Sequence, residues 1–134
     1  MTLKYEHLTG EILAACFEVS NELGAGFLES VYQSALLLAI QQKRLQARSE
    51  VPVEVSFRSQ VVGQFFADIL VEDKVIVELK AVKALAPEHQ AQVINYLKAT
   101  GFEVALLVNF GKPKLEYKRL ENRFNKDTQD KQDK

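Results

Sequence analysis

The stretch that decides the fold runs from Phe66 to Leu85 and reads FADILVEDKVIVELKAVKAL. Two apolar segments rich in Val, Ile and Leu flank the polar turn Glu-Asp-Lys, as expected for two paired strands. The first segment contains one carboxylate, Asp68, and the second contains Glu78 and Lys80. Strands of this composition are usually buried, and a buried charge is costly unless it is paired or holds a metal ion. The three charged residues therefore require an explanation.

Hairpin geometry predicts that these charged residues meet. Side chains alternate across a strand, so Glu78 and Lys80 lie on the same face. If the Glu-Asp-Lys turn closes the hairpin, Val71 pairs with Val75, and Asp68 then lies opposite Glu78. No glycine marks the turn, and a register shifted by one residue would separate the three side chains. The prediction of one charged cluster depends on this register.

Such a cluster has the outline of a nuclease site. Two neighbouring carboxylates repel each other and take up a proton unless a cation lies between them. Oxygen ligands suit Mg²⁺ or Mn²⁺, which retain several waters and often bind phosphate at the same time. The amine of Lys80 could orient or help to deprotonate an attacking water, or offset the charge of a phosphorane-like transition state. The alternative is an ordinary ion pair at a strand end, which this spacing alone does not exclude.

The same residues resemble the core motif of the PD-(D/E)xK phosphodiesterase superfamily, in which an aspartate precedes an ExK triplet. Three further blocks resemble those of the GxxExxY protein family, a branch of that superfamily. They are residues 26–32 (GFLESVY), 89–97 (HQAQVINYL) and 107–111 (LVNFG). The resemblance spans residues 5–115 and implies a restriction-endonuclease-like α/β fold with a mixed central sheet flanked by helices. Ser20 and Ala25 depart from the family pattern, where histidine and proline are usual.

The resemblance also implies a set of site residues around a Mg²⁺ or Mn²⁺ ion. The metal ligands would be Asp68, Glu78, the backbone carbonyl of Leu79 and, through water, Glu29. The catalytic residues would be Glu29, Asp68, Glu78, Lys80, Gln92 and Tyr96. Substrate would be bound by His89, as a phosphate ligand or proton-transfer group, and by Tyr32.

Several of these residues also have an ordinary structural interpretation. Glu29 lies in the first turn of a predicted helix, where the helix dipole favours a carboxylate. Tyr32 could be a core aromatic of the same helix. Gln92 and Tyr96 could form the polar flank of a later helix. The patterns leave these alternatives open.

Apolar periodicity predicts the elements around this stretch. We expect helices at residues 9–23, 28–46 and 87–100, with Thr9 as the first N-cap. Strands are expected at 51–56, 61–71 and 74–82 as an antiparallel meander, with a bulge near Gly63, and at 102–110 as a parallel strand. An edge strand could follow at 115–118. The second helix is predicted to face inward through Leu28, Val31, Tyr32, Ala35, Leu38 and Ala39, and the third through Ala91, Ile94 and Leu97.

Length, charge and cysteine content limit the function classes. With 134 residues, the chain fits one domain at residues 1–120, followed by a polar tail at 121–134 that we expect to be disordered. The formal net charge is -1, so the protein lacks the overall positive potential of proteins that bind DNA tightly without sequence specificity. One cysteine, Cys16, excludes an internal disulfide and is predicted to be inert packing. The apolar runs are too short to span a bilayer, so a cytoplasmic protein is expected.

The sequence therefore favours a metal-dependent phosphodiesterase that acts on DNA or RNA. The chief alternative is a nuclease-fold module with weak or no turnover that binds nucleic acid or accompanies a protein partner. Hydrolysis of a small phosphodiester is a third possibility. A basic helix end at residues 41–44, with Arg48, is one candidate phosphate contact. Because the domain is small, a homodimer or a larger partner is expected to add recognition surface.

Overall fold

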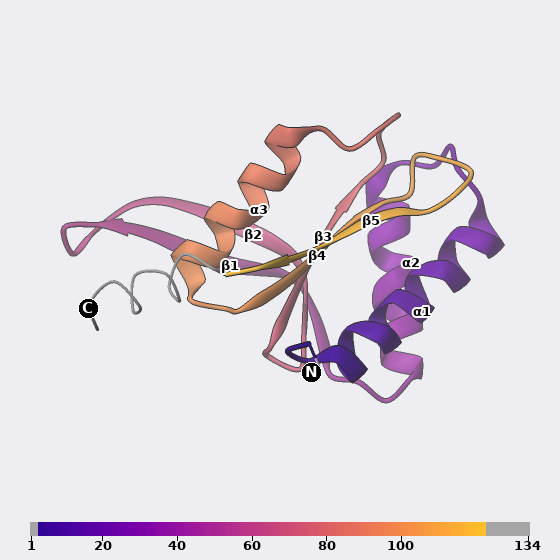
Figure 1. Cartoon of the computed structure of the whole chain (residues 1–134), viewed down its shortest axis with the longest axis horizontal. Helices are drawn as coiled ribbons and strands as arrows, with labels where there is room; N and C mark the ends of the chain where they lie inside the picture. The colour runs from indigo at the N-terminus through magenta and orange to yellow at the C-terminus, as the bar shows by residue number, and fades with distance from the viewer. Residues whose placement is uncertain (1–2, 123–134) are drawn as a thin grey trace.

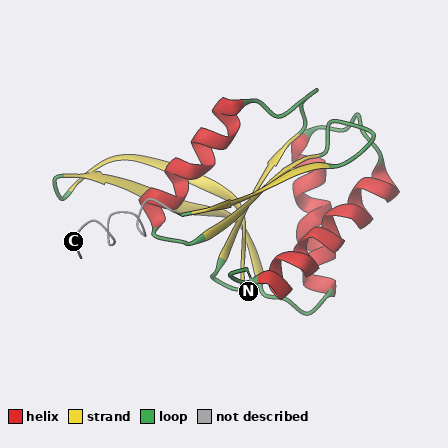
Figure 2. Cartoon of the chain, viewed as in Figure 1, coloured by secondary structure: helices red, strands yellow, loops and turns green. Residues whose placement is uncertain are grey.

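A computed structural model describes residues 3–122 of the chain. Five strands form one mixed sheet in the order β1-β2-β3-β4-β5, with α1 and α2 on one face and α3 on the other (Figures 1 and 2). Strands β3 and β4 are parallel, and the other neighbouring pairs are antiparallel. The elements are α1 (Glu6–Leu23), α2 (Glu29–Gln42), β1 (Ala47–Phe57), β2 (Gln60–Val71), β3 (Val75–Lys80), α3 (Pro87–Thr100), β4 (Val104–Asn109) and β5 (Glu116–Glu121).

The predicted register of the central hairpin is confirmed. Val71 pairs with Val75 and Ile69 with Val77, so continuing this register places Asp68 opposite Glu78. The antiparallel meander and the parallel β4 reached through α3 are also as predicted. Every residue of β4 is buried, because helices cover both faces of the sheet there.

The hairpin of β1 and β2 is longer than predicted and reaches beyond the rest of the sheet (Figure 1). Its turn residues, Arg58 and Ser59, have φ angles of 52° and 64°, the left-handed values of a two-residue turn whose twist matches the strands. The pairing shifts between Val55 and Ser56, which leaves Val62 as an extra residue. The bulge therefore lies next to Gly63, where it was predicted.

The second helix differs from the prediction in its length and in the face it buries. Helix α2 ends at Gln42 rather than at residue 46. Leu28 and Leu38, predicted to face inward, are 77% and 56% exposed, and Val31 is also exposed. The buried residues are Tyr32, Leu36 and Ile40. Tyr32 is buried as predicted and Ala35 and Ala39 are partly buried, so the prediction was wrong for Leu28, Val31 and Leu38. Apolar residues surround most of this helix, so periodicity alone did not identify its buried face.

Smaller corrections concern the other helices. Helix α1 begins at Glu6, so Thr9 lies within it and donates a hydrogen bond to the Tyr5 carbonyl at 3.1 Å instead of capping the helix. Helix α3 has the predicted bounds, and Leu97 is buried as predicted. Its other buried residue is Val93, whereas Ile94 is only partly buried and Ala91 is exposed.

Other predictions concern burial, membrane helices and the tail. Cys16 is fully buried, and burial raises the pKa of its thiol to about 12, as expected for inert packing. Among residues 3–122, no helix is long and apolar enough to cross a membrane. The predicted tail begins too early, because β5 extends to Glu121, and its remainder from residue 123 lies outside the described residues.

The loops that follow β3 and β4 are fastened to each other. The Asn109 side chain donates to the Val82 carbonyl at 2.9 Å and accepts from the Val82 N–H at 3.0 Å. Gly111 lies so close to this segment that an added Cβ would overlap the Val82 backbone. Backbone contact at this point therefore requires glycine.

Replacing Gly111 with alanine is expected to destabilise the protein by about 2 kcal/mol, because the neighbouring backbone must move to admit the Cβ. Thermal unfolding measures the change. Gly10→Ala in α1 is the control, since an added Cβ meets nothing within 4 Å there, and it should leave stability unchanged or slightly raised. Equal melting temperatures for Gly111→Ala and wild type would contradict the close backbone contact.

Candidate active site

Asp68 and Glu78 meet where the pairing of β2 with β3 ends. The Glu78 carboxyl accepts the Asp68 backbone N–H at 3.0 Å, and the Asp68 carboxyl accepts the Leu79 N–H at 2.8 Å. Each side chain thus binds the opposite strand where ladder hydrogen bonds would otherwise continue. Glu78 is only 4% exposed, whereas Asp68 is half-buried. The two carboxyl groups come together as the hairpin register predicted.

The pKa values of both carboxyl groups are raised. Burial, followed by the neighbouring Asp68 charge, raises the pKa of Glu78 to about 8. Burial also raises the pKa of Asp68, but the hydrogen bond between the side chains lowers it while raising that of Glu78. The proton therefore resides on Glu78 at neutral pH. A buried acid pair of this kind is suited to exchanging its proton for a cation.

Lys80, Gln92 and Tyr96 form a polar row beside the carboxyl pair. The Lys80 Nζ lies 3.4 Å from the Gln92 Oε1, and Gln92 is hydrogen-bonded to Tyr96. Burial, followed by the charges of Glu78 and Asp68, raises the pKa of the Tyr96 phenol. The phenol stays protonated and can donate a hydrogen bond to an anion. The structure thus brings all three residues to the carboxyl pair.

Glu29 approaches the pair from the first turn of α2. The residue as a whole is exposed, but its carboxyl is partly buried. That burial, followed by the Asp68 charge, raises the pKa of the carboxyl, while Lys80 lowers it. One turn later, Gln33 donates to the Asp68 backbone carbonyl at 3.0 Å. Helix α2 is therefore fastened to β2 beside the carboxyl pair.

Tyr32 and His89, the predicted substrate-binding residues, have structural roles. Tyr32 is fully buried, stacks on Phe110 with ring centroids 4.9 Å apart and donates its hydroxyl hydrogen to the Gly24 carbonyl. It is a core aromatic, which was the alternative interpretation. His89 accepts the Ala86 N–H through Nδ1 at 2.9 Å and so caps α3. Only its Nε2 is left for a ligand.

The donor set suits a hard divalent ion. Among residues 3–122, no three Asp, Glu, His or Cys side chains gather closely enough to hold a metal by themselves. Mg²⁺ needs fewer protein ligands than that, because it retains several waters. The N–H and C=O of a strand residue point to the same edge, so the Leu79 carbonyl faces Asp68 as its N–H does. Two carboxylates and this carbonyl therefore fit the ion.

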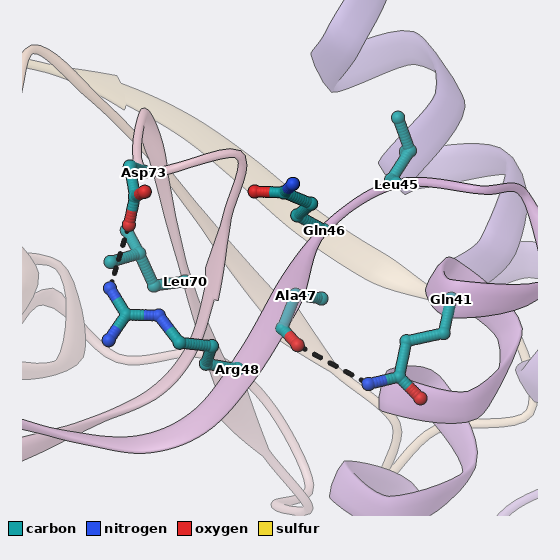
Figure 3. Close-up of a pocket in the computed structure, with 7 residues that line it drawn as sticks. All are labelled: Gln41, Leu45, Gln46, Ala47, Arg48, Leu70 and Asp73. Atoms are coloured by element: carbon teal, nitrogen blue, oxygen red, sulfur yellow. Dashed lines mark hydrogen bonds and ion pairs between the residues drawn. The ribbon is translucent and has the colours of Figure 1, made fainter.

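The basic segment proposed as a phosphate contact lies elsewhere. Arg48 forms an ion pair with Asp73 at 2.7 Å, at the opposite end of β3 from Lys80. Both residues line a pocket of about 330 Å³ into which Gln41 also projects (Figure 3). Lys43 is paired with Glu18 at 2.9 Å. Neither Asp68 nor Glu78 lines this pocket.

Sequence reasoning missed three residues at the site. Gln33 and Glu50 bind each other at 3.0 Å beside Asp68. Phe65 stacks on Tyr96 with ring centroids 3.7 Å apart. The one sequence signal for Gln33 is its position, since it lies one helical turn after Glu29 and therefore on the same face of the predicted helix. Nothing in the local sequence marks Glu50 or Phe65.

Comparison with known proteins identifies a family for this chain. Residues 6–120 match the model of the PD-(D/E)XK nuclease superfamily. The solved structure of SSO0001 is similar, with a TM-score of 0.55 and 18% identity over 92% of this chain and 67% of that chain. An alkaline exonuclease from Laribacter hongkongensis, LHK-Exo, is also similar, with a TM-score of 0.53 and 13% identity over 96% of this chain and 76% of that one. Nothing among curated proteins matches the chain.

At these identities the two structures show the fold alone. Together with the mixed sheet and its flanking helices, they confirm the predicted restriction-endonuclease-like α/β fold.

Proposed function

The chain belongs to the PD-(D/E)XK nuclease superfamily, and from this premise we propose that it is a divalent-metal-dependent nuclease that hydrolyses phosphodiester bonds of DNA or RNA. The observation that supports the proposal most directly is the carboxyl pair of Asp68 and Glu78, whose side chains each accept a backbone N–H of the opposite strand beside Lys80. Superfamily members generally use a divalent metal, and Mg²⁺ or Mn²⁺ suits these oxygen donors.

The ligand set follows from the donors described above. Asp68, Glu78 and the Leu79 carbonyl would hold the ion, with Glu29 bound through a water. A bound Mg²⁺ or Mn²⁺ supplies Lewis-acid activation of water and neutralises charge on the phosphate. Glu78 must lose its proton when the ion binds, because a ligating carboxylate is deprotonated. Metal affinity is therefore expected to rise with pH towards about 8, the pKa of Glu78.

The remaining residues act on water and phosphate. In hydrolysis, a water oxygen forms a bond to phosphorus as the bond to a sugar oxygen breaks, and that oxygen takes up a proton. Lys80 would hold the attacking water and offset the developing negative charge. Gln92 keeps the Lys80 amine in place, since its Oε1 lies 3.4 Å away. Tyr96 would donate its phenolic hydrogen to a phosphate oxygen.

Cleavage of a mixed panel of single- and double-stranded DNA and RNA tests the proposal. Wild type is expected to cut at least one of them with Mg²⁺ or Mn²⁺ and none with chelator. Asp68→Asn should be inactive while folded, because an amide oxygen can still accept the Leu79 N–H but the charge is lost. A folded wild type that binds these polymers and cuts none, with either ion, would instead favour a binding module. Turnover of dinucleotides without polymer binding would favour a small-phosphodiester hydrolase.

Two loops at the carboxyl ends of β3 and β4 support a polyanionic substrate. The segments 81–86 and 110–115 carry Lys83, Lys112 and Lys114 and no acidic residue. Ligands of α/β proteins commonly bind at this edge of the sheet. The hydrogen bonds of the Asn109 side chain to Val82 join the two loops, so the loops that carry these lysines are held next to each other. We propose that they contact nucleic-acid phosphates.

The double variant Lys83→Ala/Lys114→Ala is expected to bind nucleic acid more weakly and with a smaller salt dependence. The slope of log K against log[salt] should shrink by up to about 2, roughly one for each lost phosphate contact. Fluorescence anisotropy in chelator measures this without cleavage. Lys4→Ala/Lys74→Ala is the control pair, because both lysines lie near Tyr5, at the opposite end of β3. Equal slopes for the two double variants would argue against this surface.

We also propose that the chain lies in the GxxExxY branch of the superfamily. The spacing of Gly26, Glu29 and Tyr32 supports this assignment, as does the order of the later blocks. Two of these residues have identifiable positions in the structure. Glu29 approaches the carboxyl pair, and the Tyr32 hydroxyl bridges Gly24 and Phe27 ahead of α2.

A further inference from the structure

The side-chain alternation of β1 and β2 is interrupted at Glu50 and Asp68. Ser49 pairs with Ile69 and Val51 pairs with Ala67, so Glu50 and Asp68 occupy the same level of the two strands. Ala67 packs in the cluster under α3, whereas Ile69, two residues on, packs in the cluster under α1 and α2. Regular alternation would keep these two residues on one face. The strands are therefore irregular at the point where the site begins.

The irregular segment is held by side chains. Glu50 has a φ of 52°, a left-handed value that is uncommon for a residue other than glycine. The Asp68 N–H is bound by Glu78, and the Asp68 carbonyl is bound by Gln33 at 3.0 Å. The same Gln33 nitrogen donates to the Glu50 carboxylate at 3.0 Å. The Gln33 amide nitrogen thus donates one hydrogen to the Asp68 carbonyl and one to the Glu50 carboxylate, and neither of these groups can donate a hydrogen bond in return.

Resting on the function proposed above, we propose that Gln33 is a positioning residue that joins helix α2 to the Asp68 backbone, with Glu50 orienting its amide, and so holds Glu29 beside the carboxyl pair. Gln33 and Glu29 are four residues apart and lie on one face of α2. Fastening Gln33 to β2 therefore sets how closely Glu29 approaches Asp68. Glu50 acts through Gln33 and need not touch metal or substrate.

The chain contains a matched control on the same helix. Gln41, two turns further along α2, donates its side-chain amide to the Ala47 carbonyl of β1 at 3.3 Å (Figure 3). Both glutamines thus join α2 to a strand carbonyl, but only Gln33 does so at the site. Methionine has a similar length and cannot donate a hydrogen bond. Gln33→Met and Gln41→Met therefore remove the same type of contact at two distances from Asp68.

The first test is amide hydrogen exchange of the metal-free protein. Gln33→Met is expected to exchange about three- to tenfold faster than wild type at Asp68, at Leu79 and in the first turn of α2, as for loss of one hydrogen bond. Gln41→Met should leave those amides unchanged. Unchanged exchange in Gln33→Met would overturn the proposal. This measurement needs no metal or cleavage, so it tests the docking of α2 even if the protein is not a nuclease.

The second test is Mn²⁺ binding measured by calorimetry, with single-turnover cleavage as a companion. Gln33→Met is expected to lower Mn²⁺ affinity and the cleavage rate constant about tenfold, as for other groups that orient metal ligands, while the affinity for DNA in chelator stays the same. Glu50→Gln keeps an acceptor for the Gln33 amide and should retain most affinity, whereas Glu50→Ala should approach Gln33→Met.

The outcomes separate this inference from the proposed function. Wild-type Mn²⁺ affinity in Gln33→Met would overturn the positioning role and leave the nuclease proposal intact. Loss of DNA affinity in place of Mn²⁺ affinity would also overturn it, because Gln33 would then act as a substrate contact. A wild type that neither binds Mn²⁺ nor cleaves would refute the nuclease proposal instead.

Discussion

Lys80→Ala is expected to lower the single-turnover rate constant of cleavage by about a hundredfold or more, while substrate and Mn²⁺ affinities change little. The amine lies beside the carboxyl pair and is held by Gln92, so its main effect should be on the transition state. Lys80→Arg should rescue little, because a planar guanidinium differs from a compact ammonium in size and hydrogen-bond geometry. Quenched-flow cleavage with enzyme in excess measures the rate constant.

Lys74→Ala is the control for this experiment. Lys74 immediately precedes β3, whereas Lys80 is its last residue, so the two lysines lie at opposite ends of one strand. Lys74→Ala should cleave like wild type. If Lys80→Ala weakened substrate binding and left the rate constant intact, Lys80 would be a phosphate contact and not part of the chemistry.

Glu78→Gln is expected to stabilise the metal-free protein at alkaline pH and to abolish cleavage. The pKa of Glu78 rises from 4.5 to about 8 on folding. Between these values the folded state keeps a proton that the unfolded state has lost, so the free energy of unfolding falls as pH rises. Glutamine stays neutral and can still accept the Asp68 N–H. Above pH 8 the variant should therefore be more stable than wild type, on the order of 2 kcal/mol, or about 7 °C in Tm.

Thermal unfolding with chelator, from pH 4 to pH 9, measures this effect. The difference between variant and wild type should be small below about pH 4.5, where the acid is protonated in both states. Mg²⁺ should raise the Tm of wild type but not of Glu78→Gln, because only the wild type can bind it. Glu54→Gln, an exposed glutamate of β1, should follow wild type throughout. Parallel curves for wild type and Glu78→Gln would show that Glu78 does not hold the proton.

The centre of the site was predictable because it depends on local pairing. A three-residue turn, Glu72-Asp73-Lys74, sets the register of β2 and β3, and strand alternation then brings Asp68, Glu78 and Lys80 together. Helix α3 was predictable within its bounds, since Pro87 and Gly101 mark its two ends. From these bounds, the spacing of Gln92 and Tyr96 placed them on one face.

Other features depend on tertiary packing that local sequence does not encode. The change of face at Glu50 and Asp68 depends on two strands that are irregular at the same level and on the hydrogen bonds of Gln33, which join α2 to both residues. Helix α2 is apolar on most sides, so only contact with α1 and the sheet decides that Leu36 is buried and Leu38 exposed. The stacking of Phe65 on Tyr96 joins β2 to α3, which β3 and the loop at residues 81–86 separate in the sequence.

The most direct test of the account is anomalous scattering from a crystal of the protein soaked in Mn²⁺. The account predicts one strong peak between the Asp68 and Glu78 carboxylates, within bonding distance of their oxygens and of the Leu79 carbonyl. Lys80 should lie beside it, with its amine free to reach a water on the ion. A Mn²⁺ peak elsewhere, or none while the two carboxyl groups remain hydrogen-bonded to each other, would contradict it.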